Sequence, residues 1–242
     1  MKTVLITGLA RGIGAATAAL FADSGYNVVI NYNTSEAEAS ALCALLKEKG
    51  CNVIAVKADV SKFGDVEYLF QKAQEAFGGV DVLVNNAGIA QQKLFTDITS
   101  DDYERMFDCN VRSVFNCCQK ALPYMIHNKY GRIINISSMW GIVGASCEVH
   151  YSASKAAVIG MTKALAREVA PSGITVNCIA PGVIDTPMNK GFDEETMQCL
   201  KEETPVGRIG TAEEIARSVL FFADKNSGFV TGQVLGVDGG FI

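Results

Sequence analysis

Three side chains suited to proton transfer lie close together in the segment SSMWGIVGASCEVHYSASKAA, residues 137–157. Tyr151 and Lys155 are four positions apart in a predicted helix, so they share one helix face. A nearby ammonium favours the phenolate and lowers the pKa of a tyrosine from its ordinary value near ~10. Tyr151 could therefore act as a general acid toward a carbonyl oxygen that has gained charge, with the Ser138 hydroxyl bonding the same oxygen. Taken alone, a Tyr/Lys pair at this spacing is more often a surface contact.

Short apolar, β-branched runs alternate with helical patterns along the chain. The predicted strands are 3–7, 27–31, 52–56, 80–84, 131–137, 174–180 and 233–237. They are apolar without clean alternation, as expected for parallel strands covered on both faces. Helical patterns at 35–50 and 65–79 both end in glycine, a common helix stop. The sequence therefore predicts an α/β fold with a doubly wound parallel sheet, whose carboxyl edge would carry Ser138.

A glycine-rich segment, TGLARGIG (7–14), follows the first predicted strand and opens the first helix. Gly8, Gly12 and Gly14 would let the backbone approach a pyrophosphate, which the helix N-terminus favours electrostatically. The spacing is G-x-x-x-G-x-G, and glycines also serve tight turns. The strand–turn–helix context nevertheless predicts a nucleotide site.

The end of the second strand indicates which dinucleotide would bind. NAD sites usually carry Asp or Glu there, bonding the ribose 2′-hydroxyl. Here the chain reads Asn31-Tyr32-Asn33-Thr34, without a carboxylate. Arg11 could bind a 2′-phosphate through a charge-assisted fork, and a solvated loop charge is the alternative interpretation. We therefore predict NADP(H) in preference to NAD.

Composition excludes several classes of protein. The formal net charge of −5 argues against a nucleic-acid binder, which usually presents a basic face. The eight cysteines form no C-x-x-C pair and only two histidines are present, so we expect reduced, packed thiols and no metal site. The N-terminal apolar run is too short for a signal peptide or a membrane span, which favours a cytoplasmic protein without membrane contact.

The combined motifs resemble those of the short-chain dehydrogenase/reductase family along essentially the full chain. They are TGLARGIG (7–14), DV (59–60), NNAG (85–88), Asn110 in CNV, Ser138, YSASK (151–155) and PGVIDT (181–186). The resemblance implies one Rossmann-type domain over 1–242 with about seven parallel strands. It also implies a cofactor half at about 1–130 and a catalytic and substrate half at about 131–242.

Carried over by position, the resemblance implies a catalytic tetrad of Asn110, Ser138, Tyr151 and Lys155. Tyr151 would donate the proton, Lys155 would bond the nicotinamide ribose, and Asn110 would hold a water that relays protons to Lys155. The implied cofactor residues are Gly8, Arg11, Gly12, Ile13, Gly14, Asn31, Asp59, Val60, Asn86, Ala87, Gly88, Tyr151, Lys155, Pro181, Gly182, Ile184 and Thr186.

Within the family, GRIINISS, KALAREVAPSGITVNCIAPGVIDT and FVTGQVLGVDGG resemble bacterial 3-oxoacyl-[acyl-carrier-protein] reductases. That resemblance implies NADPH-dependent reduction of a β-ketoacyl thioester on a carrier protein. Family members that dock carrier protein often carry arginines where this chain reads Asn128-Lys129 and Pro171-Ser172. Because carrier protein is acidic, their loss would weaken docking unless Lys129 and Arg132 compensate.

Besides the missing arginines, Glu148 also differs from the pattern of the 3-oxoacyl-[acyl-carrier-protein] reductases, because many of them carry glutamine at this position. The segment 137–152 is closer to reductases of a 5-aminopentanone group on a lysine of elongation factor P. A carboxylate beside the ketone would attract that substrate's amine, and Trp140 could add a cation–π wall. Alternatively, Glu148 only caps the helix of Tyr151 and Trp140 only packs.

Two expectations concern regions outside the site. The segment 185–210 has several prolines and glycines, which indicates either a substrate lid or an ordinary surface loop. The resemblance implies a homotetramer built on helices at about 100–121 and 151–169.

A third functional alternative is a sensor protein that binds NADP without catalysing a reaction. Such a sensor would have no use for Tyr151 and Lys155 at their spacing.

Overall fold

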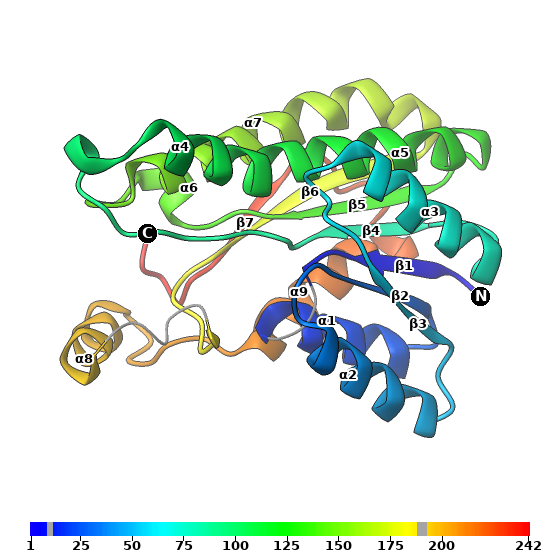
Figure 1. The fold of residues 1–242 in the computed structure, drawn as a ribbon, viewed down its shortest axis with the longest axis horizontal. Coiled ribbons are helices and arrows are strands. Elements are labelled where there is room, and N and C mark those ends of the chain that lie inside the picture. Colours follow the sequence, from blue (N-terminus) through cyan, green and yellow to red (C-terminus); the bar gives the residue numbers. More distant parts are fainter. Residues whose placement is uncertain (9–11, 188–192) are drawn as a thin grey trace.

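The computed structural model of the protein describes residues 1–8, 12–187 and 193–242. Within these ranges, seven parallel strands form one sheet in the order β3-β2-β1-β4-β5-β6-β7 (Figure 1). The strands are β1 Thr3–Ile6, β2 Asn27–Tyr32, β3 Val53–Lys57, β4 Val82–Asn85, β5 Gly131–Ile136, β6 Ile174–Pro181 and β7 Val234–Val237. The chain reverses its strand order between β1 and β4, and ligands of open α/β sheets bind at the carboxyl ends beside such a point.

Helices cover both faces of this sheet (Figure 1). One layer holds α1 Gly12–Asp23, α2 Glu36–Glu48 and α9 Ala212–Ala223. The other holds α3 Phe63–Phe77, α4 Ser100–Phe107, α5 Ser113–His127 and α7 Val149–Val169. A π-helical turn, η2 Asp108–Arg112, joins α4 to α5, and short helical segments occur at η1 Phe95–Asp97, α6 Trp140–Val143, η3 Ala170–Ser172 and η5 Lys225–Ser227.

Each helical layer packs its own buried core against the sheet. Leu5 lies in the core under α3, α5 and α7, whereas its neighbour Ile6 lies in the core under α1, α2 and α9. Successive strand residues point to opposite faces of a sheet, so both must be apolar when both faces are covered. This explains why the strands read as unbroken apolar runs.

Local signals define where the helices begin and end. Gly78 ends α3 in the left-handed region at φ 82°, which favours glycine because it lacks a Cβ. Thr99 begins α4 in a capping box with Asp102, and Thr211 begins α9 in the same way with Glu214. The Thr99–Asp102 box also contributes to the polar cluster beside the candidate site.

The predicted fold class is confirmed, and each predicted strand lies within two residues of an observed one. The segment 185–210 is more regular than its prolines and glycines suggested, because α8 (Glu194–Glu203) forms there, off the carboxyl edge of the sheet (Figure 1). All eight cysteines are free thiols. Across the described ranges, no helix combines the length and apolar character needed to cross a membrane.

Candidate functional site

Two adjoining cavities open at the carboxyl ends of the strands. The larger has a volume of about 1020 Å³ and the smaller about 400 Å³. They share a wall made of Ile13, Asn86, Gly88, Ala90 and Thr186. A ligand in the larger cavity would therefore reach the smaller one.

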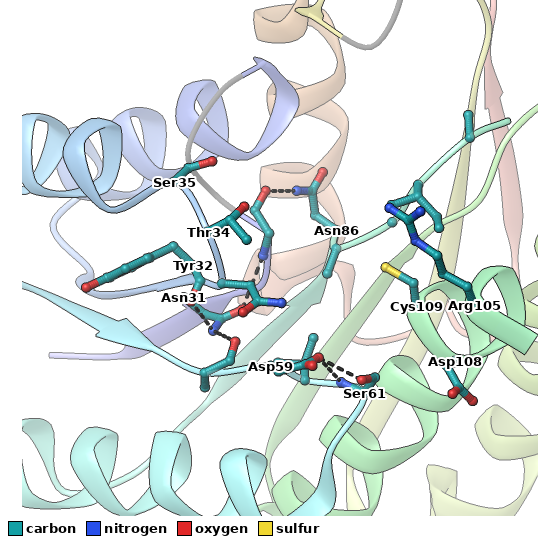
Figure 2. A pocket seen from close by; sticks show the side chains of 18 of the residues that line it. Asn31, Tyr32, Thr34, Ser35, Asp59, Ser61, Asn86, Arg105, Asp108 and Cys109 are labelled. Carbon is teal, nitrogen blue, oxygen red and sulfur yellow. Dashed lines mark hydrogen bonds between the residues drawn. The ribbon is translucent and has the colours of Figure 1, made fainter. Parts of the chain in front are cut away.

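Gly8 forms a tight backbone cradle in the larger cavity. Its φ is +67°, and a Cβ added to it would lie 2.5 Å from Cα of Ala87. Two asparagine side chains hold this backbone from either side (Figure 2): Asn31 Oδ1 accepts from the Gly8 N–H at 3.3 Å, and Asn86 Nδ2 donates to the Gly8 carbonyl at 2.9 Å. Only glycine fits here, as expected where backbone must lie against a dinucleotide.

The start of α1 forms the next part of the same cavity. Gly12 has φ +58°, and a Cβ there would lie 3.0 Å from Cγ2 of Thr186. The first N–H groups of α1 point toward the cavity end of the helix and have no partner within it, so they suit a phosphate. Gly14 is buried in the first turn and is not among the described lining residues. Arg11 lies outside the described residues.

Residues 31–35 line the far end of the larger cavity (Figure 2). Asn31 is buried, and its amide donates to the Ala58 carbonyl at 2.9 Å, so it braces β2 against the end of β3. Tyr32, Asn33, Thr34 and Ser35 line the cavity next to Asn31, and none is acidic. Sequence reasoning identified this segment but not Ser35, which the position of α2 brings to the cavity.

Asp59 is the acidic side chain below this end of the cavity (Figure 2). Its Oδ1 accepts from Ser61 N at 3.1 Å and from Ser61 Oγ at 2.7 Å. Partial burial would raise the pKa of this carboxyl, but the Ser61 hydrogen bonds and nearby Lys62 outweigh burial, and the net pKa is lowered. Asp59 is therefore a fixed anionic acceptor beside Val60, which also lines the cavity.

Ser138, Tyr151 and Lys155 meet at the smaller cavity. The first turns of α7 carry Tyr151 and Lys155, and Ser138 follows β5. Lys155 Nζ donates to the Ile136 carbonyl at 3.0 Å, and it lies 5.8 Å from the centroid of the Tyr151 ring. Burial lowers the pKa of Lys155 to about 8.

The expectation of a lowered pKa for Tyr151 is wrong for this structure. Burial raises the pKa of Tyr151 to about 12, with a smaller lowering by a hydrogen bond to Ser138 and a further rise from Glu148. The desolvation of the phenol outweighs the distant ammonium, whose Nζ is bound to a backbone carbonyl. Tyr151 is therefore a protonated phenol across the neutral range, the form a proton donor needs.

Asn110 lies behind these residues in the π-helical turn η2. Its Nδ2 donates to the Ile89 carbonyl at 2.9 Å and to Ser154 Oγ at 3.0 Å, while its Oδ1 accepts from Ile89 N at 2.8 Å. The side chain is thus engaged in bracing the loop after β4 rather than open to the cavity. Nothing in the sequence places residue 89 beside residue 110, so this partner of Asn110 could not be predicted.

Glu148 and Trp140 both line the smaller cavity. Glu148 occupies the N-cap position of α7, but its side chain makes no capping hydrogen bond and instead accepts from Gln92 Nε2 at 3.2 Å. Burial raises the pKa of Glu148, partly offset by the Gln92 hydrogen bond. Trp140 packs edge-on against Phe241, with ring centroids 5.6 Å apart, so it both packs and faces the cavity.

The two cavities bring together most of the predicted site residues. Those lining the larger cavity are Gly8, Gly12, Ile13, Asn31, Asp59, Val60, Asn86, Ala87, Gly88 and Thr186. Those lining the smaller one also include Ser138, Trp140, Glu148, Tyr151, Lys155, Pro181, Gly182 and Ile184.

Other lining residues were missed by sequence reasoning. Gln91 and Gln92 line the smaller cavity from the loop after β4, and Thr196 and Leu200 line it from α8. The position of Gln91 and Gln92 just after a strand was an available signal, because strand carboxyl ends carry ligand sites. Nothing in the residues of α8 indicated its place. Among the residues described, His, Cys, Asp and Glu side chains form no group suited to a metal ion.

Comparisons with known proteins agree with this geometry. A family model described as enoyl-(acyl carrier protein) reductase matches residues 8–242. The 3-oxoacyl-[acyl-carrier-protein] reductase of Staphylococcus aureus is 40% identical over 239 residues, covering 99% of this chain and 97% of that one. The same-named enzyme of Chlamydia muridarum is 42% identical over 239 residues, covering 99% and 96%.

A solved structure extends the comparison to three dimensions. The crystal structure of an Agrobacterium tumefaciens protein, provisionally described as a gluconate dehydrogenase, superposes with a TM-score of 0.95 at 32% identity. The match covers 99% of this chain and 95% of that one. The chain therefore belongs to the short-chain dehydrogenase/reductase family and is an NAD(P)-dependent oxidoreductase acting on CH–OH or C=O groups.

Proposed function

We propose that the protein reduces a 3-oxoacyl thioester, carried on an acyl carrier protein, to the 3-hydroxyacyl form with NADPH. The observation that carries this proposal is the meeting of Tyr151 and Ser138 at a small cavity whose wall is shared with the larger, glycine-cradled one. Full-length similarity to enzymes named 3-oxoacyl-[acyl-carrier-protein] reductase, at 40–42% identity, supports the substrate class.

In such a reduction, each residue of the site would have a separate role. When bound, the nicotinamide cofactor supplies the hydride. Ser138 orients the ketone through its hydroxyl, and Tyr151 donates a proton from its phenol to the oxygen that gains charge. Lys155, cationic below its pKa of about 8, stabilises the phenolate left behind. Asn110 holds the loop at Ile89, whose neighbours Gly88 and Ala90 line both cavities.

NADPH is preferred over NADH in this proposal because of the residues at 32–35. None of the four carries a carboxylate to bond a ribose 2′-hydroxyl or to repel a 2′-phosphate. Ser35 lies at the N-cap of α2 without a side-chain capping bond, so its hydroxyl and the first N–H groups of α2 suit an anion. Arg11, the other candidate for the phosphate, lies outside the described residues.

Docking of an acidic carrier protein cannot use Arg132 as the sequence suggested. Arg132 is buried, its guanidinium lies 4.5 Å from the centroid of the Tyr130 ring, and Nη1 donates to the Gly131 carbonyl at 2.9 Å. Lys129 is exposed but precedes β5, at the end of the strand away from the cavities. A carrier protein would therefore have to bind through other residues around the smaller cavity.

The test is oxidation of NADPH by the purified protein with acetoacetyl-CoA, a short mimic of a β-ketoacyl carrier. We expect turnover in the wild type and a loss on the order of 10²- to 10⁴-fold in Tyr151→Phe, with NADPH affinity unchanged. Tyr130→Phe, a change outside both cavities, is the matched control. Turnover that survives Tyr151→Phe would show that another group is the acid.

A second candidate substrate is a ketone that carries a cationic amine, as in the 5-aminopentanone group on a lysine of elongation factor P. The observation that favours it is Glu148, whose carboxylate is buried in the cavity wall and makes no helix-capping bond. An ammonium there would offset the cost of burying the carboxylate, whereas the phosphates of a thioester carrier would be repelled.

Glu148→Gln separates the two candidates because it keeps the shape and removes the charge. If the substrate is a thioester, the variant should reduce acetoacetyl-CoA at least as well as the wild type. If the substrate is an amine-bearing ketone, the wild type should turn over 5-amino-2-pentanone faster than acetoacetyl-CoA, and Glu148→Gln should raise KM for the amine about tenfold or more. If the wild type and Glu148→Gln use both ketones equally well, Glu148 does not determine which substrate is bound.

A further inference from the structure

The loop after β4 and the segment before Tyr151 are joined by three successive contacts. Gln91 Oε1 and His150 Nε2 lie 2.9 Å apart, Gln92 Nε2 donates to Glu148 Oε1 at 3.2 Å, and Lys93 N donates to the Cys147 carbonyl at 2.7 Å. The two segments run in opposite directions through these contacts, which we call the 91–93 clasp. Gln91 and Gln92 also line the smaller cavity, so the clasp is part of its wall.

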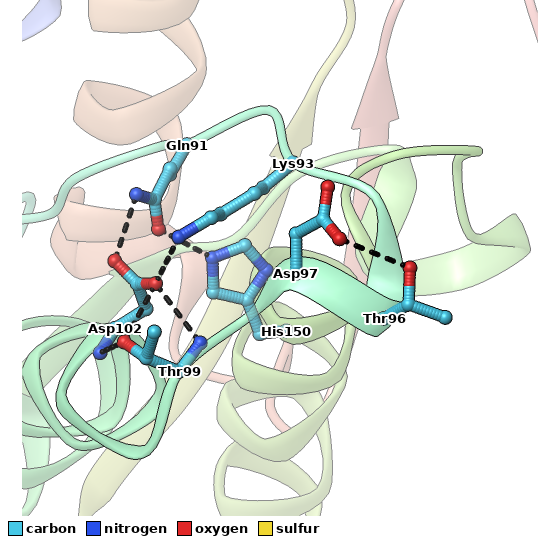
Figure 3. Close-up of polar contacts among 7 residues, drawn as sticks. All are labelled: Gln91, Lys93, Thr96, Asp97, Thr99, Asp102 and His150. Atoms are coloured by element: carbon cyan, nitrogen blue, oxygen red, sulfur yellow. Dashed lines mark hydrogen bonds and ion pairs between the residues drawn. The ribbon is translucent and has the colours of Figure 1, made fainter.

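The outer end of the clasp is anchored on the first turn of α4 (Figure 3). Asp102 accepts from Lys93 Nζ at 2.6 Å, from Gln91 Nε2 at 2.9 Å and from Thr99 N at 3.0 Å. These donors lower the pKa of Asp102, the Lys93 hydrogen bond most of all, so it stays ionised at neutral pH. An ionised carboxylate only accepts hydrogen bonds.

Asp102 thereby determines which way the Gln91 amide faces. The NH₂ group of Gln91 must face the carboxylate, so its oxygen faces His150. That oxygen can only accept, and His150 Nε2 must carry the proton between them. The chain of contacts therefore selects one tautomer of His150, with hydrogen on Nε2 and a lone pair on Nδ1.

His150 has little freedom to adopt any other state. Its side chain is 3% exposed, and within the described residues Nδ1 is buried without a hydrogen-bond partner. Burial lowers the pKa of the imidazole; Asp102 acts against this and Lys93 adds to it. From its own helix, the carboxyl of Glu148 is the other nearby acid, held by Gln92. A protonated ring would need an acceptor for Nδ1–H that these contacts do not supply.

We propose that Gln91 and His150 are positioning residues for Tyr151: the Asp102-oriented amide of Gln91 holds neutral His150 in its Nε2–H form and so sets the first turn of α7, which presents the phenol to the substrate. The proposal rests on the proposed role of Tyr151 as the proton donor. His150 immediately precedes Tyr151, so a shift of the imidazole moves the backbone that carries the phenol.

A second contact supports a positioning role rather than simple packing. Cys147, three residues before His150, has φ 60°, a left-handed conformation that is uncommon for a residue with a Cβ. Its carbonyl is the acceptor of the Lys93 N–H at 2.7 Å. Backbone in such a conformation persists where surrounding contacts determine it, and the clasp supplies that contact on the turn that leads into α7.

The first test uses the protein alone. The chain has only two histidines, and the other, His127, is exposed at the end of α5, so both imidazoles can be followed by ¹⁵N and ¹H NMR. We expect His150 to show a protonated Nε2 and an unprotonated Nδ1, and to have a pKa below the ordinary range of an imidazole. Gln91→Met, which keeps the length and removes the amide, should abolish the tautomer preference, whereas Gln92→Met should preserve it.

Gln91→Glu provides a change in the opposite direction. A second carboxylate would still accept from His150 Nε2–H, but it would favour the imidazolium and should raise the pKa of His150 above its wild-type value. A wild-type His150 with its proton on Nδ1, or one whose pKa is the same in the wild type and in Gln91→Glu, would overturn the proposal.

The second test follows Tyr151 itself. In protein with ¹³C-labelled tyrosine, the Tyr151 signal is assigned by its absence in Tyr151→Phe; it should move in Gln91→Met and stay in place in Gln71→Met, on the exposed face of α3. With acetoacetyl-CoA, Gln91→Met should lower kcat on the order of 10-fold with little change in KM for NADPH. An unmoved Tyr151 signal would refute the positioning role. Wild-type protein without acetoacetyl-CoA turnover would refute only the substrate proposal, because the NMR tests do not depend on it.

Discussion

The side-chain amide of Asn110 binds both backbone polar groups of Ile89, donating to its carbonyl at 2.9 Å and accepting from its N–H at 2.8 Å. Asn110 sits in the π-helical turn between α4 and α5, while Ile89 belongs to the loop after β4. The flanking residues Gly88 and Ala90 line both cavities. The amide therefore fixes the loop whose residues line both the larger and the smaller cavity.

Replacing Asn110 tests whether its amide holds the loop at Ile89 in place. Asn110→Leu keeps the size and leaves the partly buried Ile89 N–H and carbonyl without their partner, at a cost on the order of 1 kcal/mol for each. We expect NADPH affinity and kcat to fall together, measured by nucleotide fluorescence and steady-state kinetics. Asn128→Leu, at the exposed end of α5, is the control. Lost turnover with unchanged NADPH affinity would instead favour a proton-relay role for Asn110.

The ionisation of Lys155 predicts the pH dependence of reduction. Burial lowers the pKa of its amine to about 8, so the amine is cationic below that pH and neutral above it. Tyr151, with its pKa raised to about 12, stays protonated over the same range. The value of kcat/KM should thus be flat from pH 6 to about 7.5 and then decline toward tenfold per pH unit. A profile that stays flat to pH 10, in protein shown to be folded, would contradict this.

Cofactor preference should respond to a single carboxylate at the end of β2. Thr34→Asp would place a negative charge where the proposed 2′-phosphate lies and offer an acceptor to a ribose 2′-hydroxyl. We expect the ratio of kcat/KM for NADPH over NADH to fall by tenfold or more, or about 1.4 kcal/mol. Ser24→Asp, exposed after α1, should leave the ratio unchanged. Equal use of both cofactors by the wild type would refute the NADPH preference.

Assembly into a homotetramer is expected through the helices at about 100–121 and 151–169, as the family resemblance implies. Phe115 on α5 is 52% exposed and Tyr103 on α4 is 48% exposed, an apolar surface that water does not favour. Light scattering should give four times the mass of one chain, and Phe115→Asp should lower it. Phe63→Asp, at the start of α3, is the control for an exposed phenylalanine elsewhere. A monomeric wild type would contradict the expectation.

Residue patterns were sufficient to predict the sheet and the spacing of the catalytic groups. Unbroken apolar runs required strands covered on both faces, and Leu5 and Ile6 indeed lie in different cores. The shared helix face of Tyr151 and Lys155 follows from local helix geometry, which their spacing in the sequence specifies. Comparisons with relatives confirm the family that these motifs indicated.

Only the tertiary structure decided the environments of those groups. Burial depends on what packs above a residue, so no local pattern could show that the pKa of Tyr151 is raised rather than lowered, or that Arg132 is buried against Tyr130. The contacts of Asn110 with Ile89, and of Gln91 with His150, join residues 21 and 59 positions apart. Sequence spacing predicts neighbours within one helix or strand, whereas these pairs are neighbours only because the parallel sheet brings the carboxyl ends of its strands to one edge.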